Sequence, residues 1–121
     1  MKAILELPHP PSNNVYYRRN MYSTYLSDAG HKFKSEVSDY VVENQVPKFG
    51  DARLRVKIIL RPRSKARHDL DNYFKALLDA LQDSGVYNDD SQIDYLEMSR
   101  GEVIKGGRII ISIEAIDDST I

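Results

Sequence analysis

The strongest periodic pattern in the chain is a stripe of apolar residues between positions 71 and 84. Its members recur at positions i, i+3, i+4 and i+7, which brings them onto one face of an α-helix. They are Phe74, Leu77, Leu78 and Leu81. Gly85 follows at once, and glycine commonly ends a helix. We therefore predict an amphipathic helix over residues 71–84, with the stripe turned toward the core.

A second helix is predicted from Asp28 to Val46, where one face again repeats at helical spacing. Asp28 can cap its start, and the segment from Pro47 to Gly50 ends it. The positions on the repeating face are Phe33, Val37, Tyr40, Val41 and Asn44.

Residues 53–60 alternate between apolar and charged positions, which is typical of a strand with one buried face. The apolar positions are Leu54, Val56 and Ile58, and the cationic ones are Arg53, Arg55 and Lys57. The cationic side is either a solvated face that resists pairing at a sheet edge or a stripe that faces phosphates. The pattern leaves both interpretations open.

Further strands are predicted near both ends of the chain. Residues 3–7 form a short strand, followed by a loop over residues 10–14. Residues 93–102 and 108–116 are predicted to pair as a hairpin. Its turn contains Lys105, Gly106 and Gly107, where the glycines can take positive φ.

The order of these elements, β-α-β-α-β-β, predicts an α+β fold in which two helices pack on one mixed β-sheet. The length of 121 residues suits a single domain. We expect that domain to span residues 1–116 and residues 117–121 to form a loose tail.

Composition narrows the chemistry. The chain has no cysteine, which excludes disulfides and thiolate zinc sites, and its three histidines are scattered. Any bound metal would therefore be a hard cation held by oxygen atoms. No apolar run is long enough to cross a membrane, and the N-terminal segment is broken by proline too early for a signal peptide. We therefore expect a cytoplasmic protein.

The net charge of −1 and the pI of about 6.3 are unusual for a nucleic-acid binder. The distribution of charge changes this picture. Residues 53–67 contain seven cations and no acid, whereas residues 69–97 contain eight acids and one cation, Lys75. Adjacent blocks of this kind fit a protein that holds phosphates with one surface and metal with another.

The segment most informative about chemistry runs from Asp69 to Lys75. Carboxylates at i and i+2 diverge within a regular helix, but they converge if Asp69 is extended and Asp71 lies at the start of the helix. The face opposite the apolar stripe then carries Asp71, Lys75, Asp79 and Gln82. Two structural interpretations compete: an aspartate that only caps the helix, or an ordinary surface pair between Asp71 and Lys75.

The segment from Asn88 to Ser91 adds two more acids just before a strand. Neighbouring residues of an extended segment point to opposite sides, so one of Asp89 and Asp90 is expected to reach a common site. An ordinary polar turn is the competing interpretation. Three convergent carboxylates would hold Mg²⁺ or Mn²⁺, which activates water and orients a phosphate, and a lysine alongside would offset charge on the phosphoryl group. These parts together would make a phosphodiester hydrolase.

The Asp-Leu-Asp-Asn motif that begins at Asp69, together with Lys75, resembles the RusA family of Holliday junction resolvases. Three other stretches agree: Pro10-Pro11-Ser12-Asn13-Asn14 before Tyr16-Tyr17-Arg18, Asn88-Asp89-Asp90-Ser91-Gln92, and Lys105-Gly106-Gly107-Arg108. The resemblance extends from about residue 4 to residue 116. The chain is more acidic than is usual for junction binders of this family.

The resemblance implies Mg²⁺-dependent cutting of four-way DNA junctions by paired symmetric nicks, in DNA recombination and repair. It implies that Asp69, Asp71 and Asp90 bind the metal and that Lys75 is the essential lysine. It also implies a homodimer, and a two-fold dimer would supply the two equivalent sites that paired nicks require.

Local cations and polar side chains are the expected DNA contacts, with binding that weakens steeply as salt rises. The candidates are Asn13, Asn14, Tyr17, Arg18, Arg19, Arg61, Arg63, Lys65, Arg67 and Lys105. Tyr16 and Tyr17 could stack on unpaired bases or pack in the core. Two other functions stay open: a non-catalytic DNA-binding protein with this fold, and an interaction module in which the acids only brace the start of the helix.

Overall fold

The computed structural model describes residues 1–66 and 69–116, and its centre is a four-stranded mixed sheet. The strands are β1 (Lys2–Leu7), β4 (Leu54–Arg61), β5 (Ile93–Arg100) and β6 (Arg108–Ala115), in the order β1-β6-β4-β5. β6 runs antiparallel to both of its neighbours, and β4 and β5 are parallel. The predicted α+β fold with a mixed sheet is confirmed.

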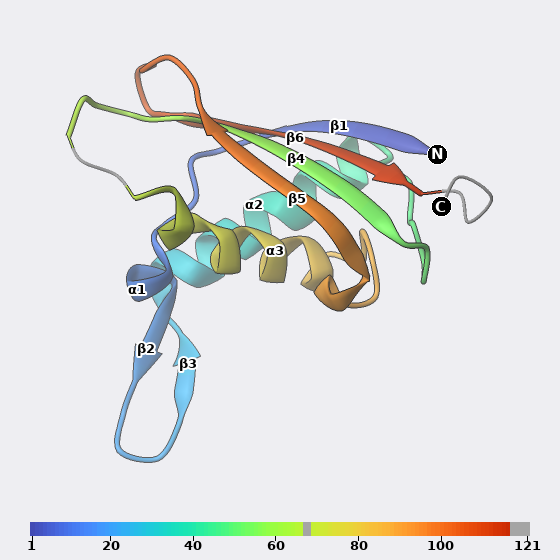
Figure 1. The fold of residues 1–121 in the computed structure, drawn as a ribbon. Helices are drawn as coiled ribbons and strands as arrows, with labels where there is room; N and C mark the ends of the chain where they lie inside the picture. The colour runs from blue at the N-terminus through green and yellow to red at the C-terminus, as the bar shows by residue number, and fades with distance from the viewer. Residues whose placement is uncertain (67–68, 117–121) are drawn as a thin grey trace.

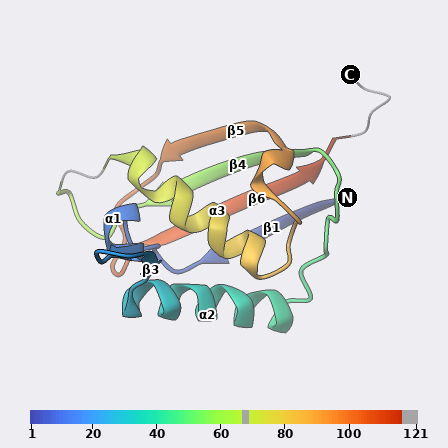
Figure 2. The same cartoon turned by 90° about the horizontal axis from the view of Figure 1, so that it is seen from below.

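Two helices, α2 (Asp28–Glu43) and α3 (Phe74–Asp83), pack on the same face of this sheet (Figures 1 and 2). The alternation of β4 explains the packing, since Leu54, Val56, Ile58 and Leu60 are almost completely buried. The predicted helical stripe meets them, with Leu77 and Leu81 inaccessible to solvent. Burying each such side chain stabilises the fold by about 1.5–3 kcal/mol.

The predicted pairing of residues 93–102 with 108–116 as a hairpin is wrong, because β4 lies between β5 and β6. β4 has the more strongly apolar inner face and takes a central place, while the largely exposed β5 is left at the edge. The chain between β5 and β6 passes the end of β4, where Gly101 N–H donates to the carbonyl of Leu60. The glycines of this connection do take positive φ, 79° at Gly106 and 69° at Gly107.

The helix boundaries differ from the predictions in an informative way. Ser27, rather than Asp28, caps α2, because its side chain accepts a hydrogen bond from Gly30 N–H. The helix ends at Glu43 rather than at Val46. The helix predicted over residues 71–84 is divided into a 3₁₀ turn, η1 (Leu70–Tyr73), and α3.

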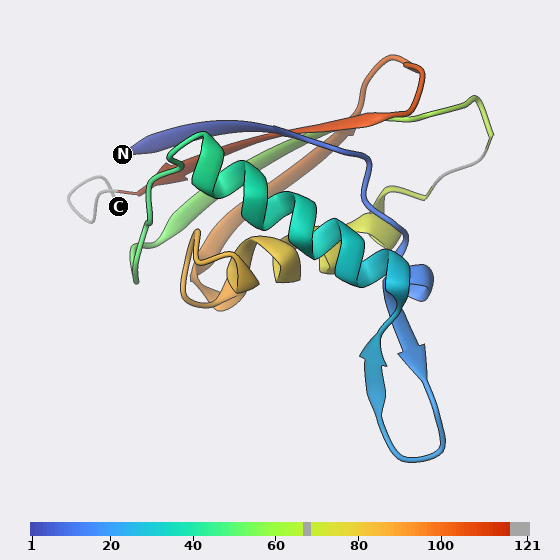
Figure 3. The ribbon, with the colours of Figure 1, turned by 180° about the vertical axis from the view of Figure 1, so that it is seen from behind.

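Three short elements near the N-terminus were not predicted. The expected loop runs into the single-turn helix α1 (Asn13–Tyr16), and a hairpin of β2 (Tyr17–Arg19) and β3 (Thr24–Leu26) follows. This hairpin projects from the helix side of the molecule, away from the sheet (Figures 1 and 3). Its root is tightly packed: Tyr16 is fully buried, and a Cβ added at Gly30 would lie 2.5 Å from the Tyr16 carbonyl oxygen.

A short 3₁₀ turn, η2 (Asp90–Gln92), precedes β5 and completes the elements that bear on the site.

Over residues 1–66 and 69–116, no helix has the length and hydropathy needed to span a bilayer.

Candidate active site along the outer side of α3

The start of the α3 region has the geometry that the two aspartates were expected to need. Asp69 is extended, with φ −79° and ψ 120°, and Asp71 lies in the first turn of η1 directly after it. Both residues are exposed. The Asp69 side chain makes no capping hydrogen bond, so helix capping does not account for it.

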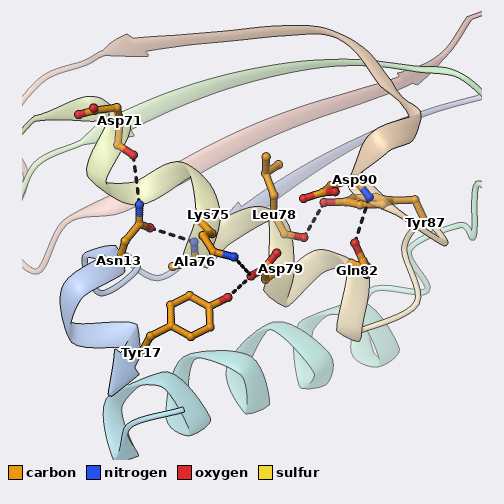
Figure 4. Close-up of polar contacts among 10 residues, drawn as sticks. All are labelled: Asn13, Tyr17, Asp71, Lys75, Ala76, Leu78, Asp79, Gln82, Tyr87 and Asp90. Atoms are coloured by element: carbon orange, nitrogen blue, oxygen red, sulfur yellow. Dashed lines mark hydrogen bonds and ion pairs between the residues drawn. The ribbon is translucent and has the colours of Figure 1, made fainter. Parts of the chain in front are cut away.

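Asn13 of α1 braces the junction between η1 and α3. Its amide nitrogen donates to the carbonyl oxygen of Asp71 (3.4 Å), and its amide oxygen accepts from Ala76 N–H (3.1 Å) (Figure 4). Ala76 lies in the first turn of α3, where backbone N–H groups lack partners within the helix. Asn13 therefore serves α3 as a cap donated from a distant segment, and it fixes the backbone between Asp71 and Lys75.

Lys75 forms its ion pair with Asp79 rather than with Asp71. The lysine Nζ lies 3.4 Å from Oδ2 of Asp79, one helical turn further along. The Tyr17 hydroxyl donates a hydrogen bond to the same carboxylate oxygen, and the lysine ammonium lies 4.9 Å from the centre of the Tyr17 ring (Figure 4). Asp79 and Tyr17 thus contact Lys75 from two directions, while 64% of its side chain remains exposed.

The electrostatics of this face are dominated by neighbouring acids. Burial, together with the charges of Asp90 and Asp83, raises the pKa of Asp79 to about 6. Asp90 is distant in sequence but close enough to Asp79 for their charges to interact. The loop before β5 and the outer side of α3 therefore share one electrostatic environment.

The two candidate acids of this loop have different roles. Asp89 is an N-cap: its carboxylate accepts from Ser91 N–H (2.8 Å), which lowers the pKa of Asp89. Gln92 completes a capping box by accepting from Asp89 N–H (2.7 Å). Asp90 instead faces α3, where its backbone N–H donates to the Gln82 side chain (3.0 Å). This division of roles favours Asp90 as the acid of the site.

Two roles in this region were not predicted. Gln82 was placed on the outer face of the helix, but its hydrogen bond to Asp90 was not expected, and the part that Gln92 plays in fixing the loop was missed. Gln92 is buried, and its amide nitrogen donates to the carbonyl oxygens of Gly50 and Ala52 (2.7 and 2.8 Å). An Asp-x-x-Gln spacing before a strand is a capping-box signal that could have revealed its role.

The donor set suits a hard cation chemically, since the exposed carboxylates offer only oxygen atoms. Geometrically, no group of three or more acids or histidines is gathered closely enough to hold a metal ion within residues 1–66 and 69–116. Asp71 and Asp90 lie toward opposite ends of the α3 face (Figure 4). Mg²⁺ often takes only one or two carboxylates, with phosphate oxygens and waters completing its shell. The residues present are compatible with that smaller set.

Several of the expected DNA contacts meet in one shallow hollow beside Lys75. Its walls include Asn13, Asn14, Tyr17, Arg18 and Arg19. The N-terminal cations and the catalytic candidate therefore share a surface although they are far apart in sequence.

The other expected contacts lie outside this hollow. Lys65 lines a second hollow with Asp69, and the Arg63 guanidinium lies 3.0 Å from Nδ1 of the buried His9. Arg61 ends β4, and Lys105 is exposed in the connection between β5 and β6. Arg67 lies outside the described residues.

The cationic side of β4 faces away from this site, because it lies on the sheet surface that no helix covers (Figure 1). Its charges also have local partners. Arg53 pairs with Asp94, and Arg55 lies 4.0 Å from Glu114 and over the Tyr95 ring. The pairing of Arg53 and Arg55 agrees better with a solvated sheet face than with a phosphate-binding stripe.

Exposed acids, an adjacent lysine and a basic hollow on a small mixed-sheet domain define the class: a candidate phosphodiester hydrolase. The family model described as endodeoxyribonuclease RusA matches residues 8–114. A crossover junction endodeoxyribonuclease of Enterobacteria phage HK97 is 39% identical over 111 residues, covering 92% of each chain. The enzymes of the same name from Escherichia coli K12 and Shigella sonnei are each 36% identical over 110 residues, covering 90% of this chain and 91% of theirs. The chain belongs to the RusA family.

Proposed function

We propose that this chain is an endodeoxyribonuclease that resolves four-way DNA junctions by hydrolysing a phosphodiester bond at the crossover. Its family membership supports the reaction, because the relatives that match nearly all of the chain carry the name crossover junction endodeoxyribonuclease. The structural observation that carries the proposal is the row of Asp71, Lys75, Asp79 and Asp90 along the outer side of α3, beside a hollow lined by cations.

The cofactor in this proposal is a divalent cation, Mg²⁺ or Mn²⁺, held by one or two carboxylates from the set Asp69, Asp71 and Asp90, with phosphate oxygens and waters as its other ligands. Such an ion, when bound, lowers the pKa of a water molecule and offsets charge on the phosphate. Asn13 would hold the backbone of Asp71 in place through its hydrogen bond to the Asp71 carbonyl. Gln82 would do the same for Asp90.

Lys75 is proposed to contact the scissile phosphate and to offset the negative charge that develops there. Its exposed ammonium can reach a strand lying in the hollow, while the contacts with Asp79 and Tyr17 limit its motion. Arg18, Arg63, Lys65, Arg67 and Lys105, with Asn13, Asn14 and Tyr17, are the proposed DNA contacts.

The proposed active form is a homodimer. Resolution of a four-way junction requires a nick in each of two strands, and two-fold symmetry supplies two identical sites at once. The measurement that bears on this is the molar mass in solution, alone and bound to a junction.

The proposed function predicts that Asp71→Asn abolishes cutting while folding and junction binding persist, because only a charge is removed at an exposed position. The assay uses a synthetic four-way junction, each strand labelled in turn, with Mg²⁺, Mn²⁺ or chelator. Asp39→Asn on the exposed side of α2 is the matched control, since it removes the same charge away from the site.

Wild-type nicks that are paired, symmetric and metal-dependent would support the proposal, with Asp39→Asn unchanged. Cutting by Asp71→Asn at the wild-type rate would show that the assignment of Asp71 is wrong. Tight junction binding with no nicks in either metal would instead support the alternative, a non-catalytic DNA-binding protein.

A further inference from the structure

The β2–β3 hairpin carries two large apolar side chains that lie outside the hydrophobic core. Met21 and Tyr22 at its tip are 87% and 90% exposed. They lie in the turn between β2 and β3. This turn is the far end of an arm that extends well away from the sheet and helices (Figures 1 and 3). Their contribution to stability is therefore small, and both side chains are accessible to another molecule.

The tip is ordered before any such contact. The Asn20 side-chain oxygen accepts from the backbone N–H groups of Tyr22 and Ser23, both at 2.8 Å. Asn20 N–H in turn donates to the Ser23 carbonyl (3.0 Å), which closes the turn. The backbone of the tip is thus held in one conformation, which lowers the entropy cost of binding.

The root of the arm is equally well fixed. Ser27 N–H donates to the carbonyl of Tyr16 (3.0 Å), and the Ser27 hydroxyl donates to the carbonyl of Val15. The hydroxyl of Tyr17, the first residue of β2, donates a hydrogen bond to the Asp79 carboxylate of α3. The direction of the arm is therefore set by the same helix that carries Lys75.

The charge of the arm identifies its partner as a polyanion. No acidic residue occurs between Glu6 and Asp28, in a chain whose net charge is −1. Arg18 and Arg19 lie on the arm and line the hollow that also contains Lys75. A strand whose phosphate lies at Lys75 would continue past these two arginines toward the tip.

We propose that this hairpin probes the branch point of DNA: Arg18 and Arg19 hold the strand that passes Lys75, and Met21 and Tyr22 stack on base faces that are exposed at the crossover. The inference rests on the proposed function and adds to it a determinant of specificity. In an intact duplex each base is already stacked on both sides, so the tip has no free base to contact. At a branch the stacking is interrupted, and aromatic side chains bind exposed base faces without regard to sequence.

The test compares the wild type with the double variant Met21→Ser/Tyr22→Ser, bound without divalent metal to a four-way junction with 2-aminopurine at the crossover. The wild type is expected to lower the 2-aminopurine fluorescence, because stacking quenches this base, and to bind the junction more tightly than a linear duplex of the same sequence. The double variant should lose this quenching and bind the junction about tenfold more weakly. Its affinity for the linear duplex should not change.

Val42→Ser is the matched control, because Val42 is a large apolar residue, 76% exposed, on α2 rather than on the arm. It should behave as the wild type in both measurements. A second variant, Arg18→Gln/Arg19→Gln, should weaken binding to junction and linear duplex alike, with a shallower dependence on salt.

A double tip variant that binds the junction and quenches the fluorescence like the wild type would overturn the proposal. So would a tip variant that dissociates into monomers, because the arm would then bind a second copy of the chain rather than DNA. Cutting of unlabelled junction by the wild type in Mg²⁺ separates these results from a failure of the proposed function. If the wild type neither binds nor cuts the junction, the proposed function fails and the role of the arm fails with it.

Discussion

Among the residues that the structure describes, two lysine–aspartate pairs involve α3, and both have an N–O distance of 3.4 Å. Lys75 pairs with Asp79 within the helix, whereas Lys34 of α2 pairs with Asp83 across the gap between the helices. The aspartate of the first pair is 25% exposed and that of the second 42%. The first aspartate also receives the Tyr17 hydroxyl, and its pKa is raised to about 6.

The comparison shows that a distance alone does not tell what an ion pair does. An exposed pair such as Lys34 with Asp83 contributes about 0–1 kcal/mol to stability. Asp79 is only 25% exposed, and its partial burial destabilises the charged carboxylate. Its contribution to stability therefore does not explain why an aspartate occupies this position. Holding Lys75 at the edge of the hollow is such a reason. Making the same substitution in each pair therefore distinguishes the effect of losing an ion pair from the effect of losing it beside the hollow.

The largest difference is expected for the two lysines. Lys75→Met should reduce the rate of junction cutting about a hundredfold or more, because the phosphoryl group loses the positive charge that faces it. Lys34→Met removes an equivalent ion pair and should leave the rate unchanged. Single-turnover cutting at saturating protein measures both, and equal losses in the two variants would refute the special role of Lys75.

A smaller difference is expected for the two aspartates. Asp79→Asn keeps the shape of the side chain but weakens its hold on Lys75, and it should slow cutting about tenfold. Junction affinity should be unchanged or higher, because a negative charge beside the hollow is lost. Asp83→Asn should have no effect on the cutting step.

Tyr17→Phe sharpens this comparison, since it removes only the hydroxyl that binds Asp79 and keeps the ring beside Lys75. A slower cutting step with unchanged affinity would match a positioning role for Asp79. A loss of junction affinity without a change in the cutting step would instead assign Tyr17 to DNA contact.

The smallest effect is a dependence of stability on pH. The pKa of Asp79 is about 6 in the folded chain and near its ordinary value of 3.8 when unfolded, so the folded state binds more protons between these two pH values. Stability of the wild type should therefore rise as pH falls from 7 through 6, relative to Asp79→Asn, which cannot take up this proton. Between pH 7 and pH 5, the Tm of the wild type should rise by about 2–4 °C relative to the Tm of Asp79→Asn.

Thermal unfolding of both proteins between pH 5 and 7, with Asp83→Asn as the reference, measures this change. A gap in Tm between the wild type and Asp79→Asn that stays constant over this range would mean that the Asp79 carboxylate is not destabilised by its burial.

The sequence predicted those parts of the site that lie on one continuous element. Helical spacing placed Lys75, Asp79 and Gln82 on one side of α3, whereas Asp71 lies in the separate turn η1. The change from extended to helical backbone fell between Asp69 and Asp71 as expected. Such relations depend only on the periodicity of one helix or strand, which can be read directly from the sequence.

Relations across long separations could not be predicted in this way. Tyr17 meets Asp79 across 62 positions, and Asn13 meets Ala76 across 63. Nothing in the local pattern of residues 13–17 indicates a partner on α3. The hairpin was missed for a related reason: its strands have three residues each, too few for an alternation to be visible.

The order of the strands failed for a different physical reason. Adjacent strands in sequence often pair, and this tendency favoured a hairpin of β5 with β6. The apolar face of β4 needed neighbours on both sides, and that requirement prevailed. The comparative exposure of β5, visible in residues such as Asp94 and Glu97, was the available indication that it belongs at an edge.

The buried Gln92 has a consequence for motion. One side chain joins the backbone at residues 88–89 to the carbonyls of Gly50 and Ala52, four hydrogen bonds in all. The loop that presents Asp90 should therefore open only together with the segment before β4. In amide hydrogen exchange the N–H groups of Asn88 and Asp89 would then be protected far beyond what their exposure suggests. The backbone that carries the exposed Asp90 would thus open as rarely as the buried core does. The position of Asp90 beside α3 would therefore be fixed before DNA binds.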